Sequence, residues 1–211
     1  MRITEIFHSL QGESTFAGLP CAFVRTTGCN LRCSYCDTAY AFHGGREMSV
    51  DDVLAEVAAM GTGLVEVTGG EPLLQPESID LMAGLLARGH TVLLETGGSL
   101  SIDAVPAGVH VILDIKTPSS GEADANEWGN IARLDDRGQI KLVIGDRRDF
   151  DWSIEVIREH RLIDRWPVLL SPVHGAVAAA DAAAWILASG LPFRLQLQLH
   201  KYVWDPARTG V

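Results

Sequence analysis

The segment Cys29-Asn30-Leu31-Arg32-Cys33-Ser34-Tyr35-Cys36 holds three of the four cysteines of this 211-residue chain. The fourth, Cys21, lies shortly before it in an apolar run, so that all four fall within 16 residues. Disulfide frameworks of secreted chains are spread more widely, whereas clustered cysteines in an intracellular chain indicate metal or redox chemistry. The C-x3-C-x2-C spacing therefore predicts a metal or cluster site.

Three thiolates can hold three irons of a [4Fe–4S] cluster and leave the fourth iron open, as catalytic zinc keeps a position for substrate. An open iron can chelate the amino and carboxylate groups of S-adenosylmethionine. Transfer of an electron to the sulfonium then breaks a C–S bond and gives a 5′-deoxyadenosyl radical. The alternative is a structural zinc site that uses all four cysteines, but zinc ribbons usually carry two C-x2-C pairs and this chain has one. Cys21 is interpreted as a small core residue.

Apolar runs recur along the chain and predict strands. They span Ile3–His8, Ala22–Thr27, Leu64–Thr68, Thr91–Thr96, Val109–Ile115, Ile140–Ile144, Pro167–Leu170 and Arg194–His200. Several lack clean alternation, which is typical of strands covered on both faces. Helices are predicted between them: one capped by Ser49 and ending near Gly61, then Ser78–Arg88, Trp152–His160 and Ala178–Ser189. This alternation predicts an α/β fold with ligands at the carboxyl ends of the strands.

The net charge of −10 disfavours nucleic acid and anionic membrane surfaces as partners, because both carry negative charge. The first ten residues contain Arg2 and Glu5 and do not form the apolar core of a signal peptide. The longest apolar stretch, residues 176–188, is too short for a membrane span and contains Asp181. We therefore expect a cytoplasmic protein.

A second motif, Thr68-Gly69-Gly70-Glu71-Pro72, follows a predicted strand about 30 residues after the cysteines. Glycines here let backbone carbonyls approach a cofactor ammonium. The triplet with Tyr35 before Cys36, together with this GGEP segment, resembles the radical S-adenosylmethionine superfamily. The resemblance implies a single domain over residues 1–211, built as a partial (β/α) barrel of the radical S-adenosylmethionine type and reduced in size.

Further segments along almost the whole chain resemble one family within that superfamily, the 7-carboxy-7-deazaguanine synthases of the 7-deazapurine (queuosine precursor) pathway. They are residues 5–7, 10–13, 23–25, 36–38, 68–72, 95–96, 114–116 and 198–201. The resemblance implies that the enzyme is a lyase that converts 6-carboxy-5,6,7,8-tetrahydropterin to 7-carboxy-7-deazaguanine and ammonia. A Mg2+ ion assists, and S-adenosylmethionine is regenerated.

The resemblance also implies roles for single residues. The cluster ligands are Cys29, Cys33 and Cys36, and Thr38 offers an oxygen to Mg2+. The residues that hold S-adenosylmethionine are Tyr35, Cys36, Asp37, Gly70, Glu95, Asp114 and Lys116. The residues that bind the substrate are Leu10, Gln11, Gly12, Glu13, Arg25, Thr68 and His200. Arg25 suits the substrate carboxylate and Glu13 the guanidine-like edge of a pterin. Taken alone, most of these residues have plain structural alternatives: an ion pair for Arg25, Asp114 and Lys116, a turn or helix cap for Thr38, a surface loop for Glu13, and a core or rim position at a strand end for His200.

Two positions depart from the family pattern. Ser14 follows Glu13 where the family often has glycine, which is tolerated unless the position needs a positive φ. Gly97 follows Thr96 where the family often has asparagine. Both residue types accept a left-handed backbone, so the turn is expected to survive.

Two other functions remain open on the sequence. A glycyl-radical activating enzyme shares the triplet and the cluster but acts on a partner protein, and a non-catalytic zinc module would hold no iron. The 10–13 and 198–201 segments favour the small-molecule enzyme. By analogy with the family, we expect a flavodoxin- or ferredoxin-like one-electron donor and a homodimer.

Overall fold

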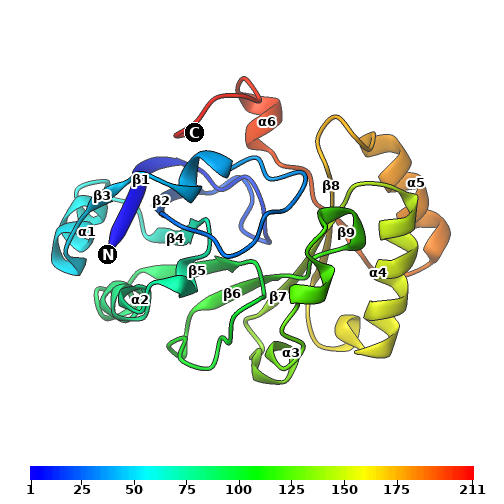
Figure 1. The fold of residues 1–211 in the computed structure, drawn as a ribbon, viewed down its shortest axis with the longest axis horizontal. Helices are drawn as coiled ribbons and strands as arrows, with labels where there is room; N and C mark the ends of the chain where they lie inside the picture. Colours follow the sequence, from blue (N-terminus) through cyan, green and yellow to red (C-terminus); the bar gives the residue numbers. More distant parts are fainter.

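The computed structural model describes residues 1–211 and builds them around one nine-stranded sheet (Figure 1). The strand order is β3-β1-β2-β4-β5-β6-β7-β8-β9. The strands are β1 (Arg2–Leu10), β2 (Pro20–Thr26), β3 (Arg46–Glu47), β4 (Leu64–Gly69), β5 (Thr91–Thr96), β6 (His110–Asp114), β7 (Gln139–Ile144), β8 (Val168–Pro172) and β9 (Arg194–Leu195). From β2 through β9 in this order, every neighbouring pair is parallel, whereas β1 is antiparallel to both β2 and β3.

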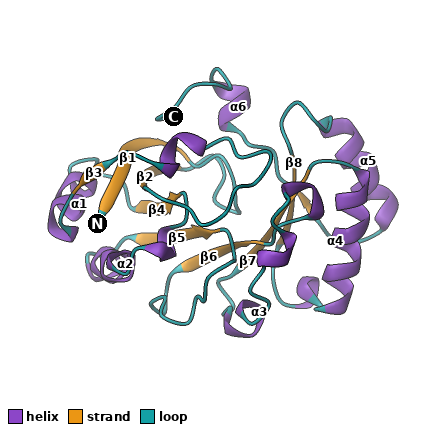
Figure 2. Cartoon of the chain, viewed as in Figure 1, coloured by secondary structure: helices purple, strands orange, loops and turns teal.

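The sheet curves but does not close, and the longer helices lie on its outer side (Figure 2). The helices are α1 (Val50–Ala58), α2 (Glu77–Ala87), α3 (Asn130–Arg133), α4 (Arg147–Glu159), α5 (Ala179–Ser189) and α6 (His200–Val203). Five short 3-10 helices complete the chain: Ala39–Phe42, Pro72–Leu74, Pro118–Ser120, Ala123–Ala125 and Leu162–Asp164. The predicted α/β fold, a partial (β/α) barrel, is confirmed.

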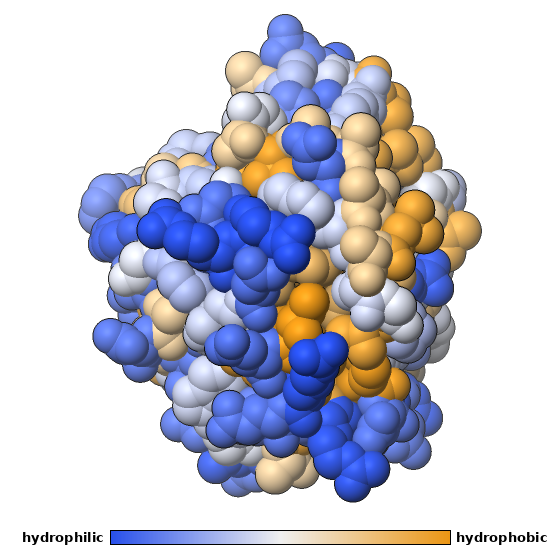
Figure 3. Space-filling view, turned by 90° about the vertical axis from the view of Figure 1, so that its right-hand side faces the viewer, coloured by the Kyte–Doolittle hydropathy of each residue, from blue (hydrophilic) through white to orange (hydrophobic).

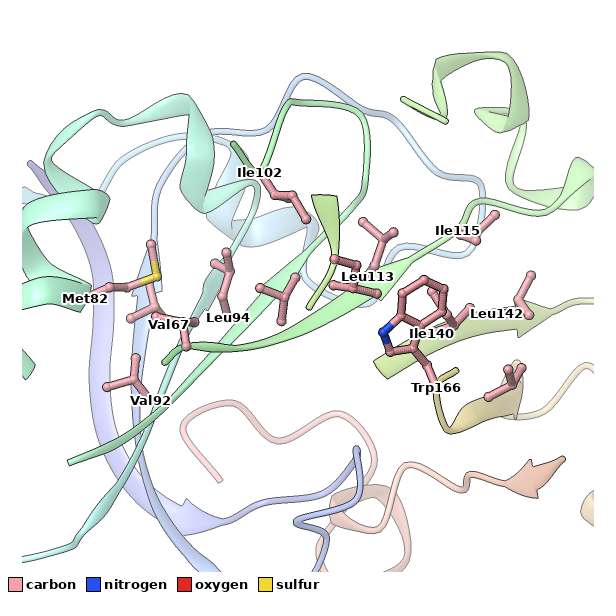
Figure 4. Close-up of a cluster of buried hydrophobic side chains, with 14 of the residues drawn as sticks. Val67, Met82, Val92, Leu94, Ile102, Leu113, Ile115, Ile140, Leu142 and Trp166 are labelled. Atoms are coloured by element: carbon pink, nitrogen blue, oxygen red, sulfur yellow. The ribbon is translucent and has the colours of Figure 1, made fainter. Parts of the chain in front are cut away.

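Alternation along each parallel strand divides its side chains between two environments. One set faces the helices and forms the main core, in which Val67 of β4, Leu94 of β5 and Leu113 of β6 pack with Met82 of α2 (Figure 4). The other set faces the barrel interior. Both sets are buried, which explains why the strands read as apolar runs without clean alternation.

The interior of the barrel has an apolar floor. Cys21, Phe23, Leu64, Leu93 and Ile112 form a separate cluster there, on four neighbouring strands. Two residues further along these strands, toward their carboxyl ends, the inward positions become polar or charged, as with Glu66 after Leu64 and Glu95 after Leu93. The barrel interior is therefore apolar at one end and polar at the carboxyl ends of the parallel strands, where ligands bind in such folds.

Two segments occupy the gap between the edges of the sheet. The loop of residues 11–19 sends Phe16 against the floor cluster, and the Thr15 backbone N–H donates to Gln139 at 2.8 Å. The chain after β9 crosses to this loop, where the Leu199 N–H donates to the Gly12 carbonyl at 2.9 Å. In Figure 1 this chain leads to α6, drawn in red between the β1 and β8 sides of the sheet.

The helix that Ser49 was predicted to cap begins as expected. The Ser49 hydroxyl accepts from the Asp52 N–H at 3.1 Å, and the Asp52 carboxylate binds Ser49 in return. Two other predictions were wrong. The strand predicted over Arg194–His200 ends at Leu195, so His200 begins the short helix α6 and does not lie at a strand end. Helix α4 begins at Arg147, five residues before the predicted start, because its first turn is charged and capped by Asp146.

No helix in the structure is both long and apolar enough to cross a membrane. The face that carries α4 and α5 shows a strip of apolar side chains beside charged ones (Figure 3). On α5, Leu187 keeps 82% of its surface exposed.

Candidate active site

A cavity of about 670 Å³ opens at the carboxyl ends of the parallel strands. Every residue that the sequence placed in the site lines it: Leu10, Gln11, Gly12, Glu13, Arg25, Cys29, Cys33, Tyr35, Cys36, Asp37, Thr38, Thr68, Gly70, Glu95, Asp114, Lys116 and His200. The predicted cluster, cofactor and substrate residues, which come from seven separate parts of the chain, therefore share one cavity.

The loop that carries the three cysteines follows β2 and is fixed to two neighbouring loops. On one side, the Glu71 N–H donates to the Gly28 carbonyl at 2.8 Å. On the other, the Ser34 N–H donates to the Ser120 carbonyl at 2.9 Å and the Ser34 hydroxyl to the Ser119 carbonyl at 2.6 Å. Hydrogen bonds therefore hold the cysteine loop to both neighbouring loops.

The cysteines suit a cluster with an open iron. Cys29, Cys33 and Cys36 are free, partly buried and exposed to the same cavity. Burial raises the pKa of the Cys33 thiol, and the nearby ammonium of Lys116 limits that rise. Cys21 is fully buried in the barrel floor, so the four cysteines do not form a joint zinc site.

The Gly-Gly-Glu segment after β4 packs tightly against the cysteine loop. A Cβ on Gly70 would collide with the Gly28 carbonyl, so only glycine fits there. Glu71 is fully buried and accepts from the Thr96 hydroxyl at 2.9 Å and the Gly97 N–H at 2.7 Å. Gly70 therefore lines the cavity, while Glu71 joins the ends of β4 and β5.

Asp114 and Lys116 form an ion pair, with Nζ and Oδ2 2.8 Å apart. Burial alone would lower the pKa of Lys116, but Asp114 and Cys33 raise it above its ordinary range, so the ammonium stays charged. The Oδ1 atom of Asp114 is buried without a hydrogen-bond partner. This arrangement fits S-adenosylmethionine, because an ammonium can bind its carboxylate and a free carboxylate oxygen can accept from its hydroxyl or amino groups.

Tyr35 closes this side of the cavity. Its hydroxyl lies 3.4 Å from the Thr117 hydroxyl and 3.4 Å from the Val143 carbonyl. Burial raises the pKa of Tyr35 to about 12, so the phenol stays neutral.

Arg25 is held at the opposite side by an ion pair and aromatic rings. Its Nε donates to Glu5 at 2.7 Å, and its guanidinium lies 5.8 Å from the Phe7 ring centre and 5.9 Å from that of Tyr40. The Tyr40 hydroxyl also donates to Glu5, at 2.7 Å. Because only Nε is used, the outer edge of the guanidinium is left for a carboxylate.

Gln11 and Thr68 lie beside a buried acid that the sequence analysis did not single out, Glu66 of β4. The Gln11 amide donates to the Glu66 carboxylate. Burial raises the pKa of Glu66 well above its usual value, and the nearby charges of Glu95 and Glu13 add to that rise.

Lys141 of β7 was also missed. Its ammonium lies 2.5 Å from the Glu95 carboxylate and forms a second ion pair with Glu13. Burial alone would lower the pKa of Lys141, but the two carboxylates raise it well above its usual range. A signal was present, because Lys141 is the one charged residue in the apolar run 140–144.

The segment of residues 198–201 links the loop after β1 to the loop that carries the cysteines. Gln198 donates to Glu13 at 3.1 Å and to Asp37 at 3.0 Å, and the Lys201 ammonium lies 2.7 Å from Asp37. Burial would raise the pKa of Asp37, but Lys201 and Gln198 lower it far below its usual value.

His200 packs against Gly12, where an added Cβ would collide with the imidazole. Burial lowers the pKa of His200 and favours its neutral form. Thr38 donates its hydroxyl to Asp37 at 3.0 Å, and no three His, Cys, Asp or Glu side chains come close enough to hold a single metal ion. The last six residues, 206–211, also line the cavity, and nothing in their sequence indicated it.

The two departures from the family pattern have different outcomes. Ser14 does adopt a positive φ of 63°, the condition under which serine is strained. At the other departure the left-handed residue is Gly98, with φ of 72°, so Gly97 itself does not need a left-handed backbone. Gly97 instead lies close to Leu31 and Lys116.

Comparison with known proteins agrees with the fold and the cysteine loop. The sequence profile of the Radical SAM superfamily matches residues 23–161. A crystal structure of QueE from Escherichia coli superimposes with a TM-score of 0.77 at 24% identity and covers 94% of each chain. A crystal structure of Streptococcus suis SuiB bound to S-adenosylmethionine has a TM-score of 0.60 at 14% identity, with 82% of this chain and 48% of SuiB covered. The chain is a member of the radical SAM superfamily.

Relatives of higher identity define the family more narrowly. A 7-carboxy-7-deazaguanine synthase of Koribacter versatilis is 45% identical, with 100% of both chains covered. One of Chlorobaculum tepidum is 44% identical, with 100% of this chain and 97% of the relative covered. Within the superfamily, the chain belongs to the 7-carboxy-7-deazaguanine synthases.

Proposed function

We propose that this enzyme converts 6-carboxy-5,6,7,8-tetrahydropterin to 7-carboxy-7-deazaguanine with release of ammonia. The observation that supports it most is the single cavity lined by the three cysteines, by the Asp114–Lys116 pair and by the loop of residues 10–13. One cavity of about 670 Å³ can hold a cofactor and a bicyclic substrate in contact.

We assign the cluster to Cys29, Cys33 and Cys36. When bound, the cluster and S-adenosylmethionine supply the radical that starts the reaction. The residues of the chain orient the reactants: Lys116 and Asp114 hold the cofactor's charged and polar groups, and Tyr35 covers it as a neutral phenol.

We assign the substrate to the opposite side of the cavity. The free edge of the Arg25 guanidinium binds the substrate carboxylate, while Glu13 accepts from the guanidine-like edge of the pterin. His200, in its neutral form, and Gln11 complete the pocket. We assign Mg2+ to the Thr38 hydroxyl, with its other ligands from substrate and water, as Mg2+ commonly prefers.

Anaerobic turnover tests the proposal. The protein is reconstituted with iron and sulfide and given S-adenosylmethionine, Mg2+, a reductant and the carboxylated tetrahydropterin, and mass spectrometry looks for 7-carboxy-7-deazaguanine. Product that disappears in Cys33→Ala and persists in Cys21→Ala supports cluster and substrate together. Cleavage of S-adenosylmethionine without product would refute the substrate and direct the search to a different small molecule or a glycyl-radical protein. One zinc per chain with no iron or sulfide would refute the radical reaction.

Two partners belong to the same proposal. A flavodoxin- or ferredoxin-like protein supplies the electron, and the chain forms a homodimer, both by analogy with the family. Sedimentation analysis tests the dimer, and reduction of the cluster by a purified flavodoxin tests the donor.

A further inference from the structure

The barrel interior contains a group of charges that the proposed function leaves unexplained. Lys141 pairs with two carboxylates, those of Glu13 and Glu95, and a third acid, Glu66, is buried nearby. A buried lysine is costly unless it is paired, so its presence on a central strand needs a reason.

Its two partners come from different parts of the site. Glu95 is the penultimate residue of β5, close to the Gly97–Gly98 turn and on the side expected to hold S-adenosylmethionine. Glu13 lies in the loop after β1, on the side expected to hold the substrate. One ammonium thus contacts both carboxylates across the middle of the cavity.

We propose that Lys141 is a positioning residue that holds Glu13 and Glu95 at a fixed separation and so sets the distance between substrate and S-adenosylmethionine. This inference rests on the proposed function, because it takes the two carboxylates to contact the two ligands. Its geometry is favourable: Lys141 is anchored in the strand β7, between β6 and β8, and its side chain is only 6% exposed.

The mechanism is electrostatic and steric. Without the ammonium, nothing offsets the repulsion between the Glu13 and Glu95 carboxylates, so the two side chains move apart. Glu13 sits in a loop, held further by Gln198 at 3.1 Å, and is the freer of the two to move. A displaced Glu13 tilts the substrate away from the radical, and small errors of placement cost large factors in rate.

The experiment compares Lys141→Met, Lys141→Arg and the wild-type enzyme. Lys141→Met removes the charge and keeps the length, whereas Lys141→Arg keeps the charge. We expect Lys141→Met to retain iron and S-adenosylmethionine cleavage, to bind the oxidised analogue 6-carboxypterin about 10-fold more weakly or worse, and to release more 5′-deoxyadenosine per product. That fold-change corresponds to about 1.4 kcal/mol. Lys141→Arg is expected to fall between the two in both measurements.

The ratio of 5′-deoxyadenosine to product separates positioning from stability, because a merely weakened fold lowers both together. A wild-type affinity and a wild-type ratio in Lys141→Met would overturn the inference and leave the substrate intact. A wild-type enzyme that cleaves S-adenosylmethionine but leaves the pterin unchanged would overturn the proposed function itself, and the inference with it.

A double variant keeps the test decisive if Lys141→Met does not fold. Lys141→Met/Glu95→Gln buries one unpaired carboxylate fewer. Because the double variant leaves Glu13 without its ammonium, we expect it to bind 6-carboxypterin more weakly than Glu95→Gln, in which Lys141 still holds Glu13, and to release more 5′-deoxyadenosine per product. Equal affinity and an equal ratio in the two variants would show that Lys141 does not position Glu13.

Discussion

Leu199 donates its backbone N–H to the carbonyl of Gly12 at 2.9 Å, which fastens the C-terminal segment to the loop after β1. His200 follows at once and packs its imidazole over Gly12. The rim of the cavity is therefore assembled from the two ends of the sequence, and its closure depends on the absence of a side chain at position 12.

Gly12→Ala is expected to displace His200 and loosen this closure. Overpacking of this kind costs about 1–3 kcal/mol of unfolding free energy. We expect a raised KM for the pterin, faster proteolysis after residue 195, and unchanged S-adenosylmethionine cleavage. Gly63→Ala is the matched control, because an added Cβ there meets nothing within 4 Å. Equal effects of the two changes would contradict the role of Gly12.

The strained backbone at Ser14 predicts an order of stability between two variants. Ser14→Gly and Ser14→Ala both lose the hydroxyl, which accepts from the Phe16 N–H at 3.2 Å. Only alanine must keep a Cβ at φ of 63°, which costs about 1–2 kcal/mol. Denaturant unfolding should therefore find Ser14→Gly the more stable by about 1 kcal/mol. The reverse order would mean that the loop relaxes out of the left-handed region.

The guanidinium of Arg25 is expected to affect the binding of only those ligands that carry a carboxylate. Arg25→Gln removes the charge that faces the substrate carboxylate, and charge-assisted bonds contribute about 1.5–3 kcal/mol. Affinity for 6-carboxypterin should fall about 10- to 100-fold. Affinity for pterin without the carboxylate should barely change. Calorimetry with both ligands makes the comparison, and equal weakening of both would place the carboxylate elsewhere.

The buried carboxyl of Glu66 makes stability depend on pH. Its folded pKa is raised above 4.5, so its contribution to stability is full below the unfolded pKa and is lost as the pH rises through the folded pKa. Glu66→Gln keeps the shape without the charge and should be more stable than the wild-type protein at pH 8, because the wild-type carboxyl must there either stay protonated or bury its charge. The gain should vanish near pH 4, where both side chains are neutral.

Thermal unfolding at the two pH values measures this difference. Glu155→Gln, an exposed position on α4, is the control and should change little at either pH. A loss of stability in Glu66→Gln at pH 8 would show that the ionised form is the stable one in the folded protein.

Much of the site could be predicted because its residues stand in short motifs at strand ends. The cysteine triplet, the Gly-Gly-Glu segment and the Asp114–Lys116 pair each carry their chemistry within a few positions. Carboxyl ends of parallel strands then bring them to one edge. The strands themselves were found for the same reason, since residues buried on both faces leave an apolar run.

What the sequence did not reveal depends on contacts between distant residues. Lys141 and Glu66 carry no local motif, and their pairing follows from which residues of β4, β5 and β7 face inward. The end of β9 was misplaced because residues 196–200 have a strand-like pattern. The Gln196 N–H still donates to the Leu170 carbonyl of β8 at 2.9 Å, but Gln198 and Leu199 bind the loop after β1. The left-handed residue of the turn after β5 could not be assigned from the sequence, because two adjacent glycines can both adopt that backbone; in the structure Gly98 does.

The loop of residues 11–19 has a consequence for how such an enzyme can change over time. Its Gln11 and Glu13 reach into the barrel, yet neither belongs to the sheet. The residues expected to hold the cofactor, in contrast, lie at strand ends, and the side chains of these strands that face the helices form the main core. On the proposed assignment of this loop to the substrate, substitutions in it alter which small molecule is accepted and leave the strand ends on the cofactor side in place, so that substrate choice and radical generation can evolve separately on this scaffold.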